Sequence, residues 1–170
     1  VRLLKRAGAD VRVIMTSGAM EFMTPLTLQA LSGNPVHHAL LDPEAEAGMG
    51  HIELAKWADL ILIAPASANL IARLAQGMGN DLLTTVCLAT EAPLCLAPAM
   101  NQAMWRDPMT QANMTHLQSA HQEKLTVIGP DAGEQACGDV GPGRMMEPEL
   151  IATEVANMFE SGALAGVSVV

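Results

Sequence analysis

Small polar residues follow three apolar runs of the sequence, where they could bind an anion. Residues 16–19 are Thr-Ser-Gly-Ala, residues 65–69 are Pro-Ala-Ser-Ala-Asn, and residues 98–101 are Pro-Ala-Met-Asn. Each group precedes a helical pattern, so its hydroxyl and amide groups and the free backbone N–H groups of the helix could hold a phosphate. Plain helix capping is the alternative for Ser17, Ser67, Asn69 and Asn101. Three such groups in succession favour a ligand site.

His51 is the histidine with the most suggestive surroundings. It starts the helical sequence His-Ile-Glu-Leu-Ala-Lys-Trp and follows the small-residue sequence Ala-Gly-Met-Gly at residues 47–50. Because imidazole titrates near neutral pH, a histidine at this place could act as a base or orient a carboxylate. The alternative is an ordinary surface histidine in the first turn of a helix.

Residues 129–146 form the most unusual stretch of the sequence, with five glycines and one cysteine, Cys137. We expect a loop here. Long glycine-rich loops in compact domains are usually lids or binding loops, and a thiol on such a loop could give or take a proton. A loop without function is the alternative. Cys87 lies in a helical pattern and Cys95 in an apolar run, so both are expected to be core residues.

The elements that would position these residues alternate between strands and helices. Four short, nearly all-apolar runs, at residues 11–16, 60–65, 94–98 and 125–128, are typical of strands that are buried on both faces. Helical patterns cover residues 1–7, 26–31, 51–57, 69–76, 81–89, 108–120 and 148–159. This alternation predicts a doubly wound, Rossmann-like (flavodoxin-like) α/β fold, with a parallel sheet and helices on both faces. Ligands of such sheets bind beyond the carboxyl ends of the strands, where the small polar residues lie.

The composition excludes several classes of protein. The chain has 170 residues, of which half are apolar, and a net charge of −9; it has two Trp, two Phe and no Tyr. An acidic chain so poor in aromatic residues argues against nucleic-acid binding. The apolar runs are interrupted well short of the roughly 20 residues of a membrane-spanning helix, and no secretory signal opens the chain, so we expect a cytoplasmic protein. Three cysteines without CxxC spacing and no clustered ligands imply no metal.

Five sequence signatures together resemble the flavin-dependent cysteine decarboxylase family. They are GHIELAKWAD at 50–59, PASANLIA at 65–72, GMGNDLL at 77–83, PAMN at 98–101 and ACGDVGPGRM at 136–145. The resemblance covers about residues 8–158 and is strongest with the phosphopantothenoylcysteine decarboxylase domains of bacterial bifunctional coenzyme A biosynthesis flavoproteins. PASAN alone is shared with other flavoproteins, whereas PAMN together with the cysteine motif and His51 is specific.

The resemblance implies an FMN-dependent decarboxylation of 4′-phosphopantothenoylcysteine to 4′-phosphopantetheine, a step of coenzyme A biosynthesis. In the mechanism of this family, the flavin oxidises the cysteinyl unit to a thioaldehyde, the carboxylate leaves as CO₂, and the flavin then reduces the resulting enethiolate. An unactivated carboxylate would leave no stabilised carbanion. The cofactor therefore supplies the electron sink, and the protein supplies orientation and protons.

The resemblance also assigns roles to residues. His51 would be the base of the oxidative step, Asn101 would bind the carboxylate and amide of the substrate, and Cys137 would donate the final proton. The other substrate-binding residues would be Met100, Ala136 and Gly138, and the FMN-binding residues would be Thr16, Ser17, Phe22, Ser67 and Asn69. The catalytic set is thus His51, Asn101 and Cys137.

The resemblance further implies how the chain is organised. Residues 1–160 would be the FMN-binding decarboxylase domain, without the first strand and the glycine- and serine-rich turn of the family, and residues 161–170 would be a linker or the start of a ligase domain. The family forms homotrimers or trimer-based dodecamers. One alternative is a peptidyl-cysteine decarboxylase or flavin prenyltransferase, which would lack the full PAMN and ACGDVGPGRM combination. The other is a non-catalytic flavin-binding regulatory subunit, which would lack His51 or Cys137.

Overall fold

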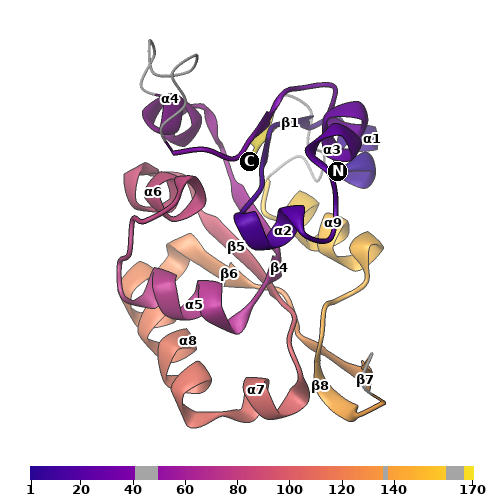
Figure 1. The fold of residues 1–170 in the computed structure, drawn as a ribbon, viewed down its shortest axis with the longest axis vertical. Coiled ribbons are helices and arrows are strands. Elements are labelled where there is room, and N and C mark those ends of the chain that lie inside the picture. The colour runs from indigo at the N-terminus through magenta and orange to yellow at the C-terminus, as the bar shows by residue number, and fades with distance from the viewer. Residues whose placement is uncertain (41–49, 136–137, 160–166) are drawn as a thin grey trace. The chain divides into compact units, whose positions relative to one another are not determined.

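The chain folds into two units, each assembled from separate stretches of sequence (Figure 1). A computed structural model describes residues 1–40, 50–135, 138–159 and 167–170. Unit 1 consists of Val1–Ile61, Gly79–Ala92 and Ala156–Val170, and unit 2 of Leu62–Met78 and Pro93–Val155. Each unit is described by itself below.

Unit 1 contains short parallel strand pairs with helices around them. Strand β1 (Asp10–Val11) pairs with β9 (Ser168–Val169), and β2 (Val13–Ile14) pairs with β3 (Val36–His37). The helices are α1 (Arg2–Arg6), α2 (Ser17–Met20), α3 (Pro25–Ser32), α4 (Gly50–Trp57) and α6 (Leu82–Ala89). The core is aliphatic; Leu54, Leu60, Ile61, Val86 and Val169 are among its fully buried side chains.

Strand β9 is held on both sides by main-chain hydrogen bonds. On one side it pairs with β1, and on the other Leu60 forms a parallel bridge to Val169. Asp59 donates its backbone N–H to the Ser168 carbonyl at 3.0 Å, and its carboxylate accepts the Ser168 N–H at 2.9 Å. Strand β9 is therefore an inner strand of unit 1.

Unit 2 contains a three-stranded sheet in the order β4-β5-β6. Its strands are β4 (Ile61–Ala66), β5 (Leu94–Pro98) and β6 (Leu125–Val127), and β5 and β6 run parallel. Every residue of β5 is buried, as its all-apolar sequence predicts. The helices are α5 (Ala68–Ala75), α7 (Gln102–Arg106), α8 (Pro108–His121), the 3₁₀ turn η2 (Gln122–Lys124) and α9 (Pro148–Asn157). Helix α5 packs against α8.

The glycine-rich stretch at residues 129–146 is not a plain loop, so that prediction is wrong in part. Strand β7 (Asp131–Glu134) pairs antiparallel with β8 (Val140–Arg144). Glycine and proline are weak strand formers and mask the alternation that identifies a strand. Backbone pairing within the hairpin, and its attachment to residues after β5, supply the order that the side chains do not.

The α/β prediction with parallel strand pairs is confirmed, and most predicted elements are present. The run at residues 11–16 is divided into two strands because β1 and β2 pair with different partners. Strand β3 was not predicted, since two residues are too short to produce a pattern. Within the described parts of the chain, no helix is long and apolar enough to cross a membrane.

Candidate active site

Asn101 begins helix α7 at the carboxyl end of strand β5, and both ends of its carboxamide are engaged. Its Oδ1 accepts the backbone N–H of Ala103 at 2.8 Å, which makes Asn101 the N-cap of the helix. Its Nδ2 donates to Oδ2 of Asp139 at 2.9 Å. Because the cap fixes the oxygen toward the helix, the amide nitrogen must face the hairpin. Asn101 is therefore presented as a hydrogen-bond donor.

The β7–β8 hairpin is attached to the chain that leaves β5. The backbone N–H of Met100 donates to the carbonyl of Gly143 at 2.9 Å. Gly143 has a φ of +140°, and a Cβ at this position would overlap the Met100 carbonyl oxygen and the Gln135 amide. Only glycine permits this approach of two backbones. The close contact brings Met100 and Asn101 together with the hairpin.

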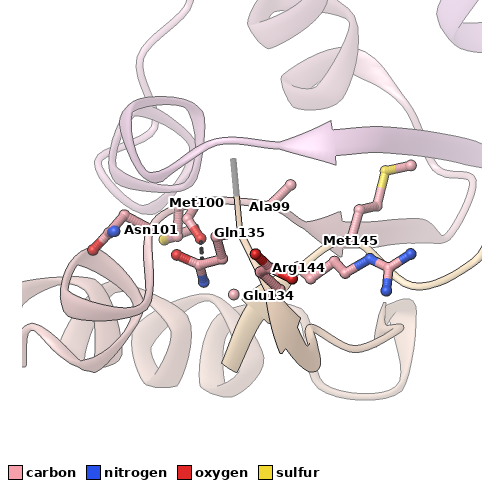
Figure 2. A pocket seen from close by; sticks show the side chains of 8 residues that line it. Ala99, Met100, Asn101, Glu134, Gln135, Arg144 and Met145 are labelled. Atoms are coloured by element: carbon pink, nitrogen blue, oxygen red, sulfur yellow. Dashed lines mark hydrogen bonds between the residues drawn. The ribbon is translucent and has the colours of Figure 1, made fainter. Parts of the chain in front are cut away.

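Gln135 adds a second attachment on the other side of Asn101. Its Oε1 accepts the backbone N–H of Gln102 at 3.0 Å, and its Nε2 lies 3.5 Å from the Met100 carbonyl oxygen (Figure 2). The backbone of Gln135 closes the hairpin turn, since its N–H donates to Asp139 O and its carbonyl accepts from Gly138 N, both at 2.8 Å. Gly138, a predicted substrate-binding residue, therefore lies in this turn.

A pocket of about 480 Å³ opens where the hairpin meets the start of α7 (Figure 2). It is lined by Ala99, Met100, Asn101, Glu134, Gln135, Gly143, Arg144 and Met145. Amide, thioether and charged groups line it together, and its volume is in the range of small-molecule sites. The Arg144 guanidinium forms an ion pair with Glu147. The pocket can take a small molecule with both apolar and polar parts.

Two predicted site residues, Ala136 and Cys137, lie outside the described residues, so their roles stay predictions. His51 is described. It is the second residue of α4 and is half-buried. Helix α4 is tied to the strand region by Arg12, whose Nη1 lies 3.1 Å from Glu53 and whose guanidinium carbon lies 4.4 Å from the centre of the Trp57 ring. The backbone that carries His51 is thereby fixed within unit 1.

Four of the five residues predicted to contact the cofactor lie at the starts of two helices. In unit 1, Thr16 caps α2 by accepting the Ala19 N–H at 3.2 Å, and Ser17 is the first residue of that helix. In unit 2, Ser67 caps α5 by accepting the Leu70 N–H at 3.3 Å. The capping alternative thus holds for Ser67 and Asn101, whereas Ser17 and Asn69 lie in the first turns of their helices and are not the caps.

Comparison with known proteins decides the family. A family model described as "Flavoprotein" matches residues 1–160. The chain belongs to the flavoprotein family. This flavoprotein is 61% identical over 159 residues to the coenzyme A biosynthesis bifunctional protein CoaBC of Haemophilus influenzae, a match that covers 94% of the chain and 39% of the relative. The chain spans about two fifths of the length of the first curated relatives that it matches.

Solved structures of similar fold point the same way. A mutant PPC decarboxylase complexed with pantothenoylaminoethenethiol is 35% identical to this flavoprotein, with a TM-score of 0.75 and coverage of 89% of this chain and 84% of that one. The FMN-binding protein AtHal3 is 34% identical, with a TM-score of 0.71 and coverage of 94% and 91%. Both agree with the flavodoxin-like α/β fold expected from the sequence.

The side chains predicted to contact the cofactor are of types that suit a flavin. Thr16, Ser17, Ser67 and Asn69 offer hydroxyl and amide groups of the kind that bind phosphate and the heteroatoms of a ring. Phe22 follows α2 and is 93% exposed, which leaves an aromatic face without a protein neighbour in the described chain. Among the described residues, no group of three or more His, Cys, Asp or Glu could hold a metal ion.

The flavoprotein's other two cysteines are unsuited to chemistry. Burial, and secondly the Asp81 carboxylate, raise the pKa of Cys87 to about 12. Burial, and secondly Glu154, raise the pKa of Cys95 to about 12. Both thiols are therefore protonated and poorly nucleophilic at neutral pH, as expected of core residues.

Sequence reasoning missed Gln135, Asp139 and Gly143, which organise the described site of the flavoprotein. Asp139 and Gly143 belong to a recognised signature, but no spacing links either to Asn101. Gln135 is one of several glutamines, and nothing in its neighbours marks it. Only the fold brings these residues to the start of α7.

Proposed function

We propose that this flavoprotein binds FMN and decarboxylates 4′-phosphopantothenoylcysteine to 4′-phosphopantetheine. The observation that carries the proposal is the Asn101 carboxamide, held as a donor at a pocket between the chain after β5 and the hairpin. A fixed amide donor suits a substrate carboxylate. The relatives include a coenzyme A biosynthesis bifunctional protein and a PPC decarboxylase, which supports the same substrate.

The residues that would hold the cofactor are Thr16, Ser17, Phe22, Ser67 and Asn69. When bound, FMN supplies the two-electron oxidation and the later reduction that allow an otherwise unactivated carboxylate to leave. The protein's part is to place the substrate and to move protons.

Three residues of the chain would carry out the other tasks, which are to bind the carboxylate, to accept a proton and to donate one. Asn101 would donate its Nδ2–H to the substrate carboxylate and hold it for departure, with Met100 packed beside the substrate. His51 would accept the proton that is released as the cysteinyl unit is oxidised, because a neutral imidazole can act as a base at physiological pH. Cys137 would return a proton to the product, and Ala136 and Gly138 beside it would contact the substrate.

The proposal extends to the assembly. Residues 1–160 would be the decarboxylase domain, and residues 161–170 would be a linker or the start of a following ligase domain, which is consistent with the share of the relatives' length that the chain spans. The enzyme would act in the cytoplasm as a homotrimer or trimer-based dodecamer. The exposed Phe22, Met23 and Leu26 supply apolar surface that such an assembly could cover.

The test uses the full-length, FMN-loaded protein with 4′-phosphopantothenoylcysteine, and it follows CO₂ and the mass of the product. We expect one CO₂ per substrate and formation of 4′-phosphopantetheine. A parallel reaction offers a peptide that ends in cysteine, to test the related peptidyl-cysteine activity. Flavin-loaded protein that releases CO₂ only from the peptide, or from neither substrate, would overturn the proposal.

A further inference from the structure

We propose that Gln135 is a positioning residue that fixes the direction of the Asn101 carboxamide toward the substrate. The inference rests on the proposed function, because it concerns the same carboxylate-binding amide. Gln135 would not itself touch the reacting atoms. It acts on the backbone on both sides of Asn101.

The Gln135 carboxamide meets two backbone groups of opposite polarity. The Gln102 N–H can only donate, so the atom 3.0 Å from it must be the Gln135 oxygen. The Gln135 nitrogen then faces the Met100 carbonyl at 3.5 Å, a longer and weaker contact. A primary amide satisfies both partners at once, whereas a carboxylate would repel the carbonyl and an apolar side chain would satisfy neither.

The glutamine is itself held in place. Its backbone closes the turn through Asp139 O and Gly138 N, and its side chain occupies the space that the absent side chain of Gly143 leaves. Asp139, in the same turn, accepts from the Asn101 side chain. The turn therefore contacts residues 100, 101 and 102 in succession, and Gln135 provides two of these contacts.

These contacts would fix the direction in which the Asn101 amide points. Asn101 caps α7, so a rotation of the backbone at residues 100–102 would turn the amide nitrogen away from its position beside Asp139. A displacement of about 1 Å at a positioned group can cost on the order of 100-fold in rate. We therefore expect Gln135→Ala to lower kcat/KM by about 10- to 100-fold without loss of FMN.

Gln135→Glu separates positioning from simple packing. The ionised side chain keeps the acceptor for Gln102 but loses the donor for Met100, and protonation of the introduced carboxyl restores the donor. The ratio of variant to parent kcat/KM should therefore rise as pH is lowered from about 8 to about 5, toward the ordinary glutamate pKa of about 4.3. The neighbouring Glu134, Asp139 and Arg144 are present in both proteins, so their titration cancels in the ratio to first order.

Gln118→Glu on the exposed side of α8 is the matched control, because it makes the same chemical change away from the hairpin. The ratio of the kcat/KM of this control variant to that of the parent should stay near one at every pH. If Gln135→Glu shows a pH-independent ratio like that of the control, the positioning role is wrong. If the parent itself releases no CO₂, the proposed function fails instead.

Hydrogen exchange of the intact, FMN-loaded protein gives a second readout that needs no activity. Because the Gln102 N–H donates to the Gln135 side chain, the peptide that contains residues 98–103 should exchange at least about tenfold faster in Gln135→Ala than in the parent. Peptides from strand β5 should be unchanged. Equal exchange at residues 98–103 in parent and variant would overturn the inference.

Discussion

At the scale of single residues, the Asn101 carboxamide combines a structural and a chemical task in one group. Its oxygen stabilises α7, and its nitrogen faces Asp139 beside the pocket. The two tasks use opposite ends of the amide, so substitution can separate them. Helix caps accept hydrogen bonds, whereas binding of a carboxylate requires a donor.

Asn101→Asp should keep the cap and lose the donor. We expect its free energy of unfolding to stay within about 1 kcal/mol of the parent, because aspartate is as good a cap as asparagine. Its kcat/KM should fall by at least about 100-fold, because a carboxylate would repel both the substrate and Asp139. Asn101→Ala is the comparison, since it should lose about 1 kcal/mol of stability as well as activity. Full activity in Asn101→Asp would contradict the donor role.

The two buried thiols give a prediction for alkaline pH. Cys87 and Cys95 each have a pKa raised from 9.0 to about 12 in the folded protein. Between these values the unfolded chain loses the thiol protons while the folded chain keeps them, so the free energy of unfolding falls as pH rises above about 9. Each thiol can contribute a loss of up to about 1.4 kcal/mol per pH unit.

Urea unfolding at several pH values from about 8 to about 11 would measure this loss. The double variant Cys87→Ala/Cys95→Ala should show a shallower decline than the parent over the same range, although its stability at pH 8 is lower through lost packing. Below about pH 9, the free energies of unfolding of the parent and the double variant should change with pH in the same way. Identical slopes above pH 9 would show that the thiols do not remain protonated in the folded state.

At the scale of elements, the β7–β8 hairpin depends on backbone contacts more than on side-chain packing. Its residues are mostly exposed, and it is joined to the segment after β5 through Gly143, Gln135 and Asp139. The hairpin therefore has little apolar burial to stabilise it. Small changes at the contact with Met100 should displace it as a body.

Gly143→Ala tests this dependence. The added methyl group would overlap the Met100 carbonyl, and the residue has a φ that alanine rarely adopts. We expect a loss of about 1–3 kcal/mol from backbone strain, or release of the hairpin from Met100, with at least tenfold lower kcat/KM. Gly133→Ala on the same hairpin is the control. The nearest atom there is Arg144 Cδ at 3.3 Å, in a flexible side chain that can move. Equal effects of the two substitutions would contradict the specific role of Gly143.

The elements differ in how far their sequences reveal them. Strand β5 and helix α8 are evident, because an all-apolar run and a proline-initiated helical pattern are local signals. The hairpin is not, because its pairing comes from the backbone of a Gly- and Pro-rich segment. Asn101 could be predicted from its position after β5. Gln135 could not, because its role depends on contacts with residues that lie far away in the sequence.

At the scale of the whole molecule, aliphatic side chains make up most of the described core, together with Met15 and Met114, and no aromatic side chain is among its buried residues. Phe22, Met23, Met104 and Met109 are all exposed, whereas Leu60 and Ile71 have no exposed surface. The shortage of aromatic residues noted in the sequence is thus compatible with a well-buried interior. Stability should depend on aliphatic side chains, including those of strand β9.

Val169→Ala would measure what β9 contributes. Val169 is 2% exposed and is held between β1 and Leu60. Removing its two methyl groups should lower the free energy of unfolding by about 1–3 kcal/mol. Ser168→Ala is the control, because the contacts described for Ser168 use its backbone; it should change stability by no more than about 0.5 kcal/mol. A neutral Val169→Ala would mean that β9 adds little to unit 1.

The position of β9 also affects when unit 1 can fold during translation. Strand β1 and its described partner β9 lie far apart in the sequence. During synthesis, β1 and Leu60 leave the ribosome long before residues 168 and 169, and until then the place of β9 between them is unfilled. Contacts between such distant residues also form slowly. Unit 1 should therefore reach its native state only after translation of this segment, with its apolar strand edges available to chaperones in the interval.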